Sequence, residues 1–276
     1  MRKLTKIALT AVLALSLAAC SNSNSQSSSE ETLTKIKVGA SPAPHAEILQ
    51  QCVEPLKEKG YDLEIVEFTD YVMPNTAVED GELDANYFAH QPYQTSFNAD
   101  NGTHIATVAA VHFEPLSIYG GKTASLDDIK DGAVIAVPND TTNEARALLL
   151  CEKLGFIKLP ENADLTVTPK DIVENPHNIE FFEVEAAQTV NVLPDCDFAV
   201  INGNYAVSAG IADTRLASED SDGIAATTYA NILCVKEGNE NNPGIQALAE
   251  VLQSDAIKTF ITDTYRGAVV PVDFSK

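Results

Sequence analysis

The chain has 276 residues, of which 45% are hydrophobic and 21% charged, so it is long enough to bury one large core or two smaller ones. Forty acidic residues stand against 18 basic ones, which gives a formal net charge of −22 at pH 7. A protein that binds nucleic acid irrespective of sequence needs a basic face to displace phosphate counterions, and no stretch of this chain supplies one. The composition therefore argues against a mostly disordered chain and against nucleic acid as a partner.

The N-terminal segment indicates export and lipid anchoring. Three basic residues among the first six precede an apolar run over 7–19, which is too short to span a bilayer but typical of a signal peptide. The run ends in Leu-Ala-Ala followed by Cys20, which resembles the lipobox of bacterial lipoproteins. We expect residues 1–19 to be a signal peptide, and residues 20–34 to be the lipidated Cys20 and a flexible Ser/Asn-rich tether. The alternative is an ordinary secretory signal in which Cys20 has no role.

The rest of the chain alternates strand-like runs with helical ones, which is typical of an α/β fold with largely parallel sheets. Apolar runs predict strands, whereas apolar residues at helical spacing, often opened by Pro and closed by Gly, predict helices. In the first part the predicted strands cover 36–40, 63–68 and 105–113, and the predicted helices 44–59, 74–81 and 90–99. The middle part has predicted helices over 125–129, 143–154 and 186–193 and predicted strands over 133–137, 179–182 and 198–201. A strand over 229–235 and helices from Pro243 and Asp255 complete the chain.

This order of elements predicts two lobes. Segment 133–210 has its own alternation of strands and helices, so we expect it to lie in a middle lobe inserted into a lobe made from both ends of the chain. The expected lobes are 35–118 together with 232–276, and 119–231, with crossing strands near 118–121 and 229–235. Lobes joined by two strands can hinge about a cleft, where we expect a ligand to bind.

Four cysteines besides Cys20 would allow two disulfides in an exported protein, with three possible pairings. Three of them extend or adjoin apolar runs, as small buried residues do, and we therefore favour free thiols. None forms a Cys-x-x-Cys pair, and the five histidines show no metal-binding spacing with them, so we expect no metal site and no cofactor. The four are Cys52, Cys151, Cys196 and Cys234.

A polar turn follows the predicted buried strand 133–137 and leads into a predicted helix. In open α/β sheets ligands bind at the carboxyl ends of strands, and the free N–H groups of a helix N-terminus attract anions. Asn143 and Arg146 are three residues apart and would share one face of this helix. The planar fork of an arginine suits a carboxylate, so Arg146 is a candidate carboxylate ligand. The alternative is a solvent-facing Arg146, with Asn139 or Asp140 serving only as a helix cap.

Aromatic side chains gather at two strand-to-helix transitions. Tyr71 lies in the first, and Phe88 and His90 lie in the second. Phe88 and His90 are two apart in an extended stretch and would point the same way. The three could line an apolar slot with polar tips. The alternative is that they are ordinary core aromatics and a hydrogen-bonded histidine.

Two asparagines stand in apolar surroundings. Asn202 follows the predicted strand 198–201, and Asn231 interrupts the predicted strand 229–235. A buried Asn is costly unless it is hydrogen-bonded, so either a ligand or the protein backbone must partner it.

The motifs of common enzyme classes are missing from the sequence. It has no Gly-x-Ser-x-Gly nucleophile turn, no phosphate-binding P-loop, no His-Glu-x-x-His zinc motif and no Cys nucleophile with an obvious base nearby. Nothing in the sequence points to catalysis, and we expect the protein not to be an enzyme.

Taken in order, these segments resemble the NlpA-type methionine-binding lipoproteins of bacterial ABC importers. The matching strings are Val-Gly-Ala-Ser-Pro at 38–42, Asp-Tyr-Val-Met-Pro-Asn at 70–75, Gly-Glu-Leu-Asp-Ala-Asn at 81–86, Val-Pro-Asn-Asp at 137–140, Glu-Ala-Ala-Gln at 185–188 and Ala-Val-Ile-Asn at 199–202. The resemblance implies a two-lobed periplasmic-binding-protein fold that closes on a free amino acid, usually L-methionine, and delivers it to a membrane permease driven by a separate ATPase. It also implies a lipid-anchored location at the cell membrane, facing outside the cytoplasm.

By position, the family's ligand contacts fall on residues already singled out above: Tyr71, Phe88, His90, Arg146, Asn202 and Asn231. The resemblance implies that Arg146 pairs with the α-carboxylate, and that the amides of Asn202 and Asn231 bond to the carboxylate and the α-ammonium. The aromatic group would then hold the thioether, because sulfur packs well near aromatic rings. In this region Ala89 departs from the family, which commonly has Gln at that position.

Other ligands and roles stay open at this point. Some relatives take another small amino acid or a short peptide, so a different amino acid or a methionine-containing dipeptide is an alternative ligand. A metal-binding lipoprotein that uses His45, His90 and His112, and a surface adhesin in which the cleft has no role, are alternatives of a different class.

Overall fold

The computed structural model describes residues 33–221 and 224–272. The predicted signal peptide, the lipid attachment site at Cys20 and nearly all of the predicted tether lie outside the described residues. Within the described part of the chain, no helix combines the length and the apolarity that crossing a membrane requires.

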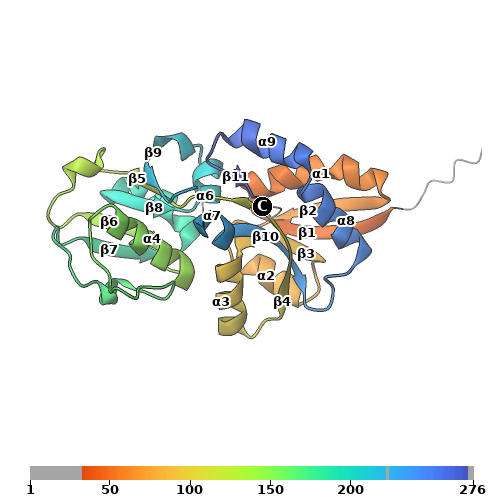
Figure 1. Cartoon of the computed structure of the whole chain (residues 1–276), viewed down its shortest axis with the longest axis horizontal. Coiled ribbons are helices and arrows are strands. Elements are labelled where there is room, and N and C mark those ends of the chain that lie inside the picture. The colour runs from red at the N-terminus through yellow and green to blue at the C-terminus, as the bar shows by residue number, and fades with distance from the viewer. Residues whose placement is uncertain (1–32, 222–223, 273–276) are drawn as a thin grey trace, which may run out of the picture. The chain divides into compact units, whose positions relative to one another are not determined.

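The first of two sheets has six strands, in the order β11-β4-β10-β3-β1-β2. They are β1 (Thr34–Ala40), β2 (Tyr61–Glu67), β3 (Ala85–His90), β4 (Ile105–Phe113), β10 (Ala230–Lys236) and β11 (Val270–Pro271). The helices packed on this sheet are α1 (Glu47–Glu58), α2 (Met73–Glu79), α3 (Gln91–Asn101), α8 (Pro243–Leu252) and α9 (Asp255–Tyr265). Helix α1 packs against both α8 and α9 (Figure 1).

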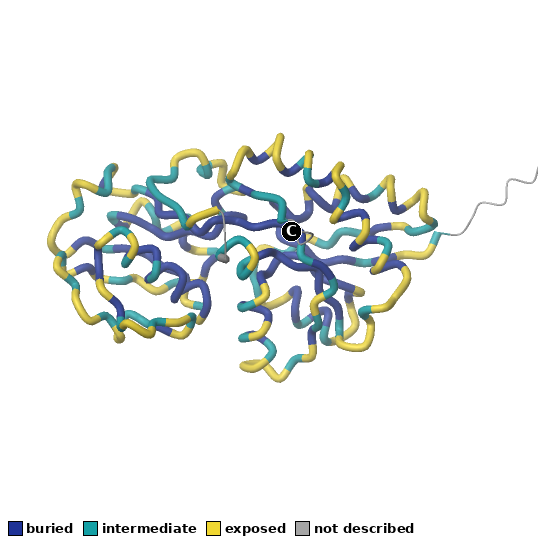
Figure 2. Tube along the Cα trace, in the orientation of Figure 1, coloured by how far each residue is buried: buried dark blue, intermediate teal, exposed yellow. Residues whose placement is uncertain are grey.

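The side chains of β10 show why both faces of the first sheet are covered. Leu233 and Val235 belong to the core formed with α1, α8 and α9, whereas Ile232 and Cys234 pack in a second cluster with α2. Because successive side chains of a strand point to opposite faces, a continuously apolar strand needs cover on both. Strands β3 and β10 are accordingly buried along almost their whole length (Figure 2).

The second sheet has five strands, in the order β7-β6-β8-β5-β9. They are β5 (Ser117–Gly120), β6 (Val134–Pro138), β7 (Glu180–Val184), β8 (Phe198–Ile201) and β9 (Arg215–Ser218). Helix α4 (Thr141–Lys153) packs in one core cluster with this sheet, and the short helices α5 (Thr189–Val192) and α6 (Gly203–Ser208) pack in another. A further short helix, α7 (Ile224–Thr228), lies between β9 and β10 in the chain. Each sheet thus has a core of its own, as the expected two-lobed α/β fold requires.

Two segments carry the chain between the sheets. The first crossing, 114–116, joins β4 to β5, and the second crossing, 219–229, joins β9 to β10. The chain leaves the first sheet along β4 and returns along β10, so these neighbours run antiparallel, as do β5 and β9 in the second sheet. The prediction of largely parallel sheets is therefore wrong: of nine described strand pairs, only β1–β2, β1–β3, β6–β7 and β6–β8 are parallel. The residue boundaries proposed for the two lobes stay a prediction.

Two predicted helices are shorter than expected. Segment 125–129 forms a single 3₁₀ turn, Leu126–Asp128, which Ser125 caps as expected by accepting a backbone N–H hydrogen bond at 3.3 Å. Segment 186–193 contains one α-helical turn, Thr189–Val192, between two 3₁₀ turns. Its β-branched residues are weak helix formers, which accounts for the broken helix.

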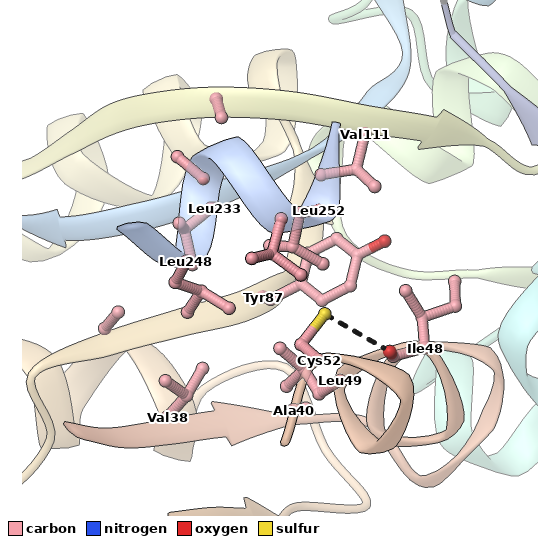
Figure 3. Packing of buried hydrophobic residues seen from close by; sticks show 14 of the residues in the cluster. Val38, Ala40, Ile48, Leu49, Cys52, Tyr87, Val111, Leu233, Leu248 and Leu252 are labelled. Atoms are coloured by element: carbon pink, nitrogen blue, oxygen red, sulfur yellow. Dashed lines mark hydrogen bonds between the residues drawn. The ribbon is translucent and has the colours of Figure 1, made fainter. Parts of the chain in front are cut away.

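The structure confirms free thiols at all four cysteines described, and each is buried. Cys52 lies in the core of the first lobe among Leu49, Tyr87 and Leu252, and its Sγ donates a hydrogen bond of 3.5 Å to the backbone oxygen of Ile48 (Figure 3). Burial raises the pKa of this thiol to about 12. Since the thiolate is the reactive form, packing alone keeps such a cysteine inert.

We expect the four buried thiols not to react with Ellman's reagent in the native protein. All four should react after unfolding in guanidinium chloride, because the core no longer excludes the reagent and the pKa values return to their ordinary range. Rapid native-state labelling at any of the four positions, located by mass spectrometry, would contradict the packing described here.

Candidate functional site

A cavity lies between residues of the first sheet and residues of the second, with about 340 Å³ of empty space when the part open to solvent is included. All six side chains singled out from the sequence line it: Tyr71, Phe88, His90, Arg146, Asn202 and Asn231. Six further residues complete the lining: Ala89, Tyr93, Glu114, Asn143, Gly203 and Asn204.

The lining residues come mainly from the ends of strands, as expected for an α/β fold. Phe88 and His90 lie at the end of β3, and Asn202 follows β8 directly. Arg146 lies in the second turn of α4, the helix that follows β6. Asn231 is the second residue of β10 and pairs with His90 across the sheet. The fold therefore brings together residues that are far apart in the sequence.

Three aromatic rings line one part of the cavity. The centroid of Tyr71 lies 5.7 Å from that of Phe88 and 5.6 Å from that of Tyr93. The hydroxyl of Tyr71 donates to Oδ1 of Asn204 at 2.6 Å, and the hydroxyl of Tyr93 donates to the backbone oxygen of Tyr71 at 2.9 Å. Since both hydroxyls are bonded to protein, what these rings can offer a ligand is chiefly apolar surface.

Asn143 orients three of the predicted site residues at once. Its Oδ1 accepts hydrogen bonds from Nε2 of His90 at 3.1 Å, Nη1 of Arg146 at 3.1 Å and Nδ2 of Asn202 at 3.0 Å. Its Nδ2 donates to both carboxylate oxygens of Asp140, which also caps α4. The predicted shared helix face of Asn143 and Arg146 is thus observed, with Asn143 as the central residue of the network.

His90 is neutral and has a defined tautomer. Its Nδ1 accepts a hydrogen bond from the backbone N–H of Tyr93 at 3.1 Å, so His90 ends β3 and caps α3 instead of starting that helix. Its Nε2 is then the donor to Asn143. Burial, together with the nearby charge of Arg146, lowers the pKa of His90 to about 3.

The guanidinium of Arg146 is buried and already paired. Its Nε and Nη2 donate to the two carboxylate oxygens of Glu219 at 3.0 and 2.6 Å. The ring of Tyr229 lies over it, with the centroid 4.3 Å from Cζ. We expected Arg146 to offer two parallel N–H donors to a ligand, but Glu219 accepts both of them. The Nη1 atom of Arg146, which is bonded to Asn143, is the donor that a ligand can still reach.

Glu114 is a buried carboxylate in the first crossing. Its Oε1 accepts a hydrogen bond from Nε2 of His112 at 2.7 Å and lies 3.4 Å from Nε2 of His45. Nε2 of His45 also bonds to Oδ1 of Asn231 at 3.0 Å, and the hydroxyl of Tyr87 donates to Nδ1 of His112. This network joins the predicted ligand Asn231 to a carboxylate that the sequence analysis did not single out.

The histidines of this network are uncharged at neutral pH. Burial lowers the pKa of His45 to about 4 and that of His112 to about 3, while burial raises the pKa of Glu114. Donor atoms of these three residues lie within 4.8 Å of one another, which is the grouping a metal ion could use. Their hydrogen bonds already account for the arrangement, however, and His90, the third histidine of the metal alternative, bonds to Asn143 instead.

We expect Gly203→Ala to destabilise the protein by about 1–3 kcal/mol, because overpacking a tight contact costs that much. A Cβ at this position would lie 2.7 Å from Cβ of Glu114 and 2.8 Å from its Oε2. Denaturant unfolding measures the change. Ser208→Ala, at an exposed position on the same helix α6, is the matched control and should change the stability by less than about 0.5 kcal/mol. Equal stability of the two variants would show that Glu114 is free to move.

Two of the cavity residues that the sequence did not lead us to predict, Glu114 and Tyr93, could have been recognised from their positions in the sequence. Glu114 directly follows the strand β4, and the same signal, a polar residue at the end of an apolar strand, pointed to Asn202. Tyr93 lies three residues after His90, in the same aromatic-rich segment. Glu219 had no such signal, because it lies in an acidic, polar stretch 73 residues from its partner Arg146.

Comparison with known proteins gives consistent matches along the chain. A family model described as NlpA lipoprotein matches residues 36–273. The methionine-binding lipoprotein MetQ of Bacillus subtilis is 40% identical over 242 residues, which are 86% of this chain and 88% of that relative. A lipoprotein structure from Ruminococcus gnavus aligns with a TM-score of 0.86 and 54% identity, covering 87% of this chain and 100% of that one. A nutrient-binding protein from Burkholderia cenocepacia, solved bound to methionine, aligns with a TM-score of 0.81 and 38% identity, covering 86% and 100%.

Proposed function

Since the chain belongs to the NlpA lipoprotein family, we propose that it is the lipid-anchored receptor of an ABC importer and that its cavity binds L-methionine. The names of its relatives support this proposal, because one is a methionine-binding lipoprotein and another was solved with methionine bound. The observation that carries it here is a single cavity that joins aromatic rings to a buried arginine and a buried carboxylate. A free amino acid with a long apolar side chain has the matching groups.

Each part of methionine has a candidate partner. The carboxylate of Glu114 suits the α-ammonium, and Nη1 of Arg146 with the amide of Asn231 suits the α-carboxylate. Asn202 presents an Oδ1 that is buried and has no hydrogen-bond partner within the described part of the chain, so it suits a second N–H of the ammonium. The rings of Tyr71 and Phe88 suit the thioether, since sulfur packs favourably against aromatic side chains.

The remaining roles follow from the family and the sequence. We propose that Cys20 carries the lipid, that the protein faces outside the cytoplasm, and that a membrane permease receives the ligand. Closure would occur between the lobes 35–118 with 232–276 and 119–231, about the crossing strands expected near 118–121 and 229–235. Binding and delivery, with no chemical change in the ligand, are the whole of the proposed activity.

Calorimetry of the full-length protein against the twenty amino acids tests this function. The protein is first unfolded and refolded to remove any ligand carried through purification. We expect heat and a raised melting temperature with L-methionine, because a ligand that binds only the folded state stabilises it by about 2.7 kcal/mol at a hundredfold excess over Kd. A panel with D-methionine and methionine-containing dipeptides separates the alternative ligands. No heat and no shift with methionine would reject the proposal.

A further inference from the structure

Glu219 connects the guanidinium of the cavity to both crossings between the sheets. It belongs to the second crossing, and its carboxylate accepts two hydrogen bonds from Arg146. Its Oε2 also accepts the backbone N–H of Leu116, in the first crossing, at 2.9 Å. Nη2 of Arg146 in turn reaches the backbone oxygen of Glu114 at 3.4 Å. Arg146 is buried and Glu219 is largely covered, with 3% of the Arg146 side chain and 12% of the Glu219 side chain exposed.

This pairing changes the electrostatics of the cavity. A lone buried guanidinium would attract any carboxylate, whether or not the molecule also carried an ammonium. Here the carboxylate of Glu219 offsets that charge at close range, the carboxylate of Glu114 lines the same cavity, and that of Asp140 lies behind the lining residue Asn143, to which it is hydrogen-bonded. The histidines next to Glu114 add no positive charge, because both are neutral at neutral pH. A carboxylate without an ammonium would therefore enter a site with an excess of negative groups.

We propose that Glu219 is a specificity-determining and positioning residue: it fixes the orientation of Arg146 and offsets its charge, so that the cavity accepts a zwitterion and rejects a simple carboxylate. The inference rests on the proposed function, since it concerns the same cavity. It adds a residue that lies outside the cavity lining and acts through Arg146. Rejection of a competitor by an unfavourable charge is a common source of specificity in binding sites.

The test compares two ligands that differ only in the ammonium group, L-methionine and 4-(methylthio)butanoate. In the wild-type full-length protein we expect the analogue to bind at least about a hundredfold more weakly than methionine. In Glu219→Gln, which keeps the size of the side chain, we expect the analogue to bind about tenfold more tightly than it binds wild type. A merely structural role for Glu219 would weaken both ligands together and could not produce this gain.

Asp220→Asn is the matched control. Asp220 is the next residue and loses the same charge, but it pairs at the surface with Lys153 at 2.7 Å, and 70% of its side chain is exposed. We expect this variant to retain the wild-type Kd values for both ligands within about twofold, since exposed ion pairs contribute little. A gain for the analogue in Asp220→Asn equal to that in Glu219→Gln would overturn the inference, as would unchanged or weaker analogue binding in Glu219→Gln.

A measurement without ligand keeps the two proposals separate. The chain has only four arginines, so nuclear magnetic resonance of ¹⁵N-arginine-labelled protein resolves few Nε–H signals. We expect one of them, assigned by its loss in Arg146→Met, to be protected from solvent exchange in wild type and to lose protection in Glu219→Gln. An unprotected Arg146 signal in wild type would overturn the positioning role. Failure of the proposed function would show instead as a wild-type protein with this protected signal and no methionine binding.

Discussion

Replacement of Arg146 by methionine is expected to weaken methionine binding by about 4 kcal/mol, which is roughly a thousandfold in Kd. The side chain of Arg146 is 3% exposed, and it is the charged donor we assign to the ligand's carboxylate. Without it the ligand's carboxylate would be buried beside Glu219 and Glu114, and the ligand's ammonium would be the one cation against three negative charges. Titration calorimetry of the wild type and the variant, each at protein concentrations comparable to its Kd, measures the loss.

Folding has to be separated from binding in this variant. Removal of Arg146 leaves the largely covered Glu219 without its cation, which costs up to about 3 kcal/mol of stability. The double variant Arg146→Met with Glu219→Gln removes both charges, so it should recover stability while binding methionine no better than the single variant. Arg215→Met is the control arginine, since Arg215 bonds to a backbone oxygen in the second lobe and does not line the cavity. Near-normal affinity in a folded Arg146→Met protein would place the carboxylate elsewhere.

Glu114→Gln is expected to weaken methionine binding by about 3 kcal/mol, or roughly 150-fold. The substitution keeps the shape of the side chain but removes the negative charge that we assign to the α-ammonium. The analogue 4-(methylthio)butanoate has no ammonium and should lose no affinity. Because Glu219→Gln should improve the analogue with a smaller effect on methionine, the pattern over the two ligands distinguishes the two carboxylates. Glu185→Gln, at an acidic residue of the neighbouring cavity, is the control and should bind methionine normally.

The same carboxylate predicts the direction of the pH dependence. Burial raises the pKa of Glu114, so lowering the pH protonates it before an exposed glutamate and removes the partner of the ammonium. Methionine affinity in wild type should therefore fall as the pH drops through this raised pKa. The neighbouring His45 and His112 have pKa values of about 4 and 3 and gain protons only later, and Arg146 keeps its charge throughout. Glu114→Gln should show a flat profile over this range, and a parallel fall in both proteins would assign the titration to another group.

Strands whose conformation depends on their own apolar residues could be predicted from the sequence, whereas strands that depend on pairing with a distant strand could not. Strands β4 and β8 have the bounds that their apolar runs predict, because burial of those runs decides their conformation. Strand β9 (Arg215–Ser218) was not predicted, since its residues are only partly buried and it forms by pairing with β5 at the edge of the second sheet. The sheet directions were mispredicted for a related reason: local periodicity does not reveal where a chain leaves one sheet for another.

For the site, the sequence indicated which residues lie near the strand ends, but not the hydrogen bonds that connect them. Tyr71, Phe88 and Arg146 each stood out by position and type, and the structure brings all of them to one cavity. The hydrogen bonds that orient them involve partners far away in the chain. Asn202 lies 59 residues from Asn143, and Glu219 lies 73 from Arg146. Such pairs arise only when strands that are distant in the chain have assembled into the second sheet, and no spacing rule anticipates them.

The four unpaired thiols have a consequence for how the protein reaches its proposed location. On the proposed route the chain would cross the membrane unfolded, and these sulfurs would then meet any oxidant outside the cytoplasm while still uncovered. Folding must then be faster than disulfide formation, because molecules that form wrong disulfides first cannot reach the native state. A substitution that slows the folding of either core should therefore lower the yield of folded protein, even where the affinity of the molecules that do fold is unaltered.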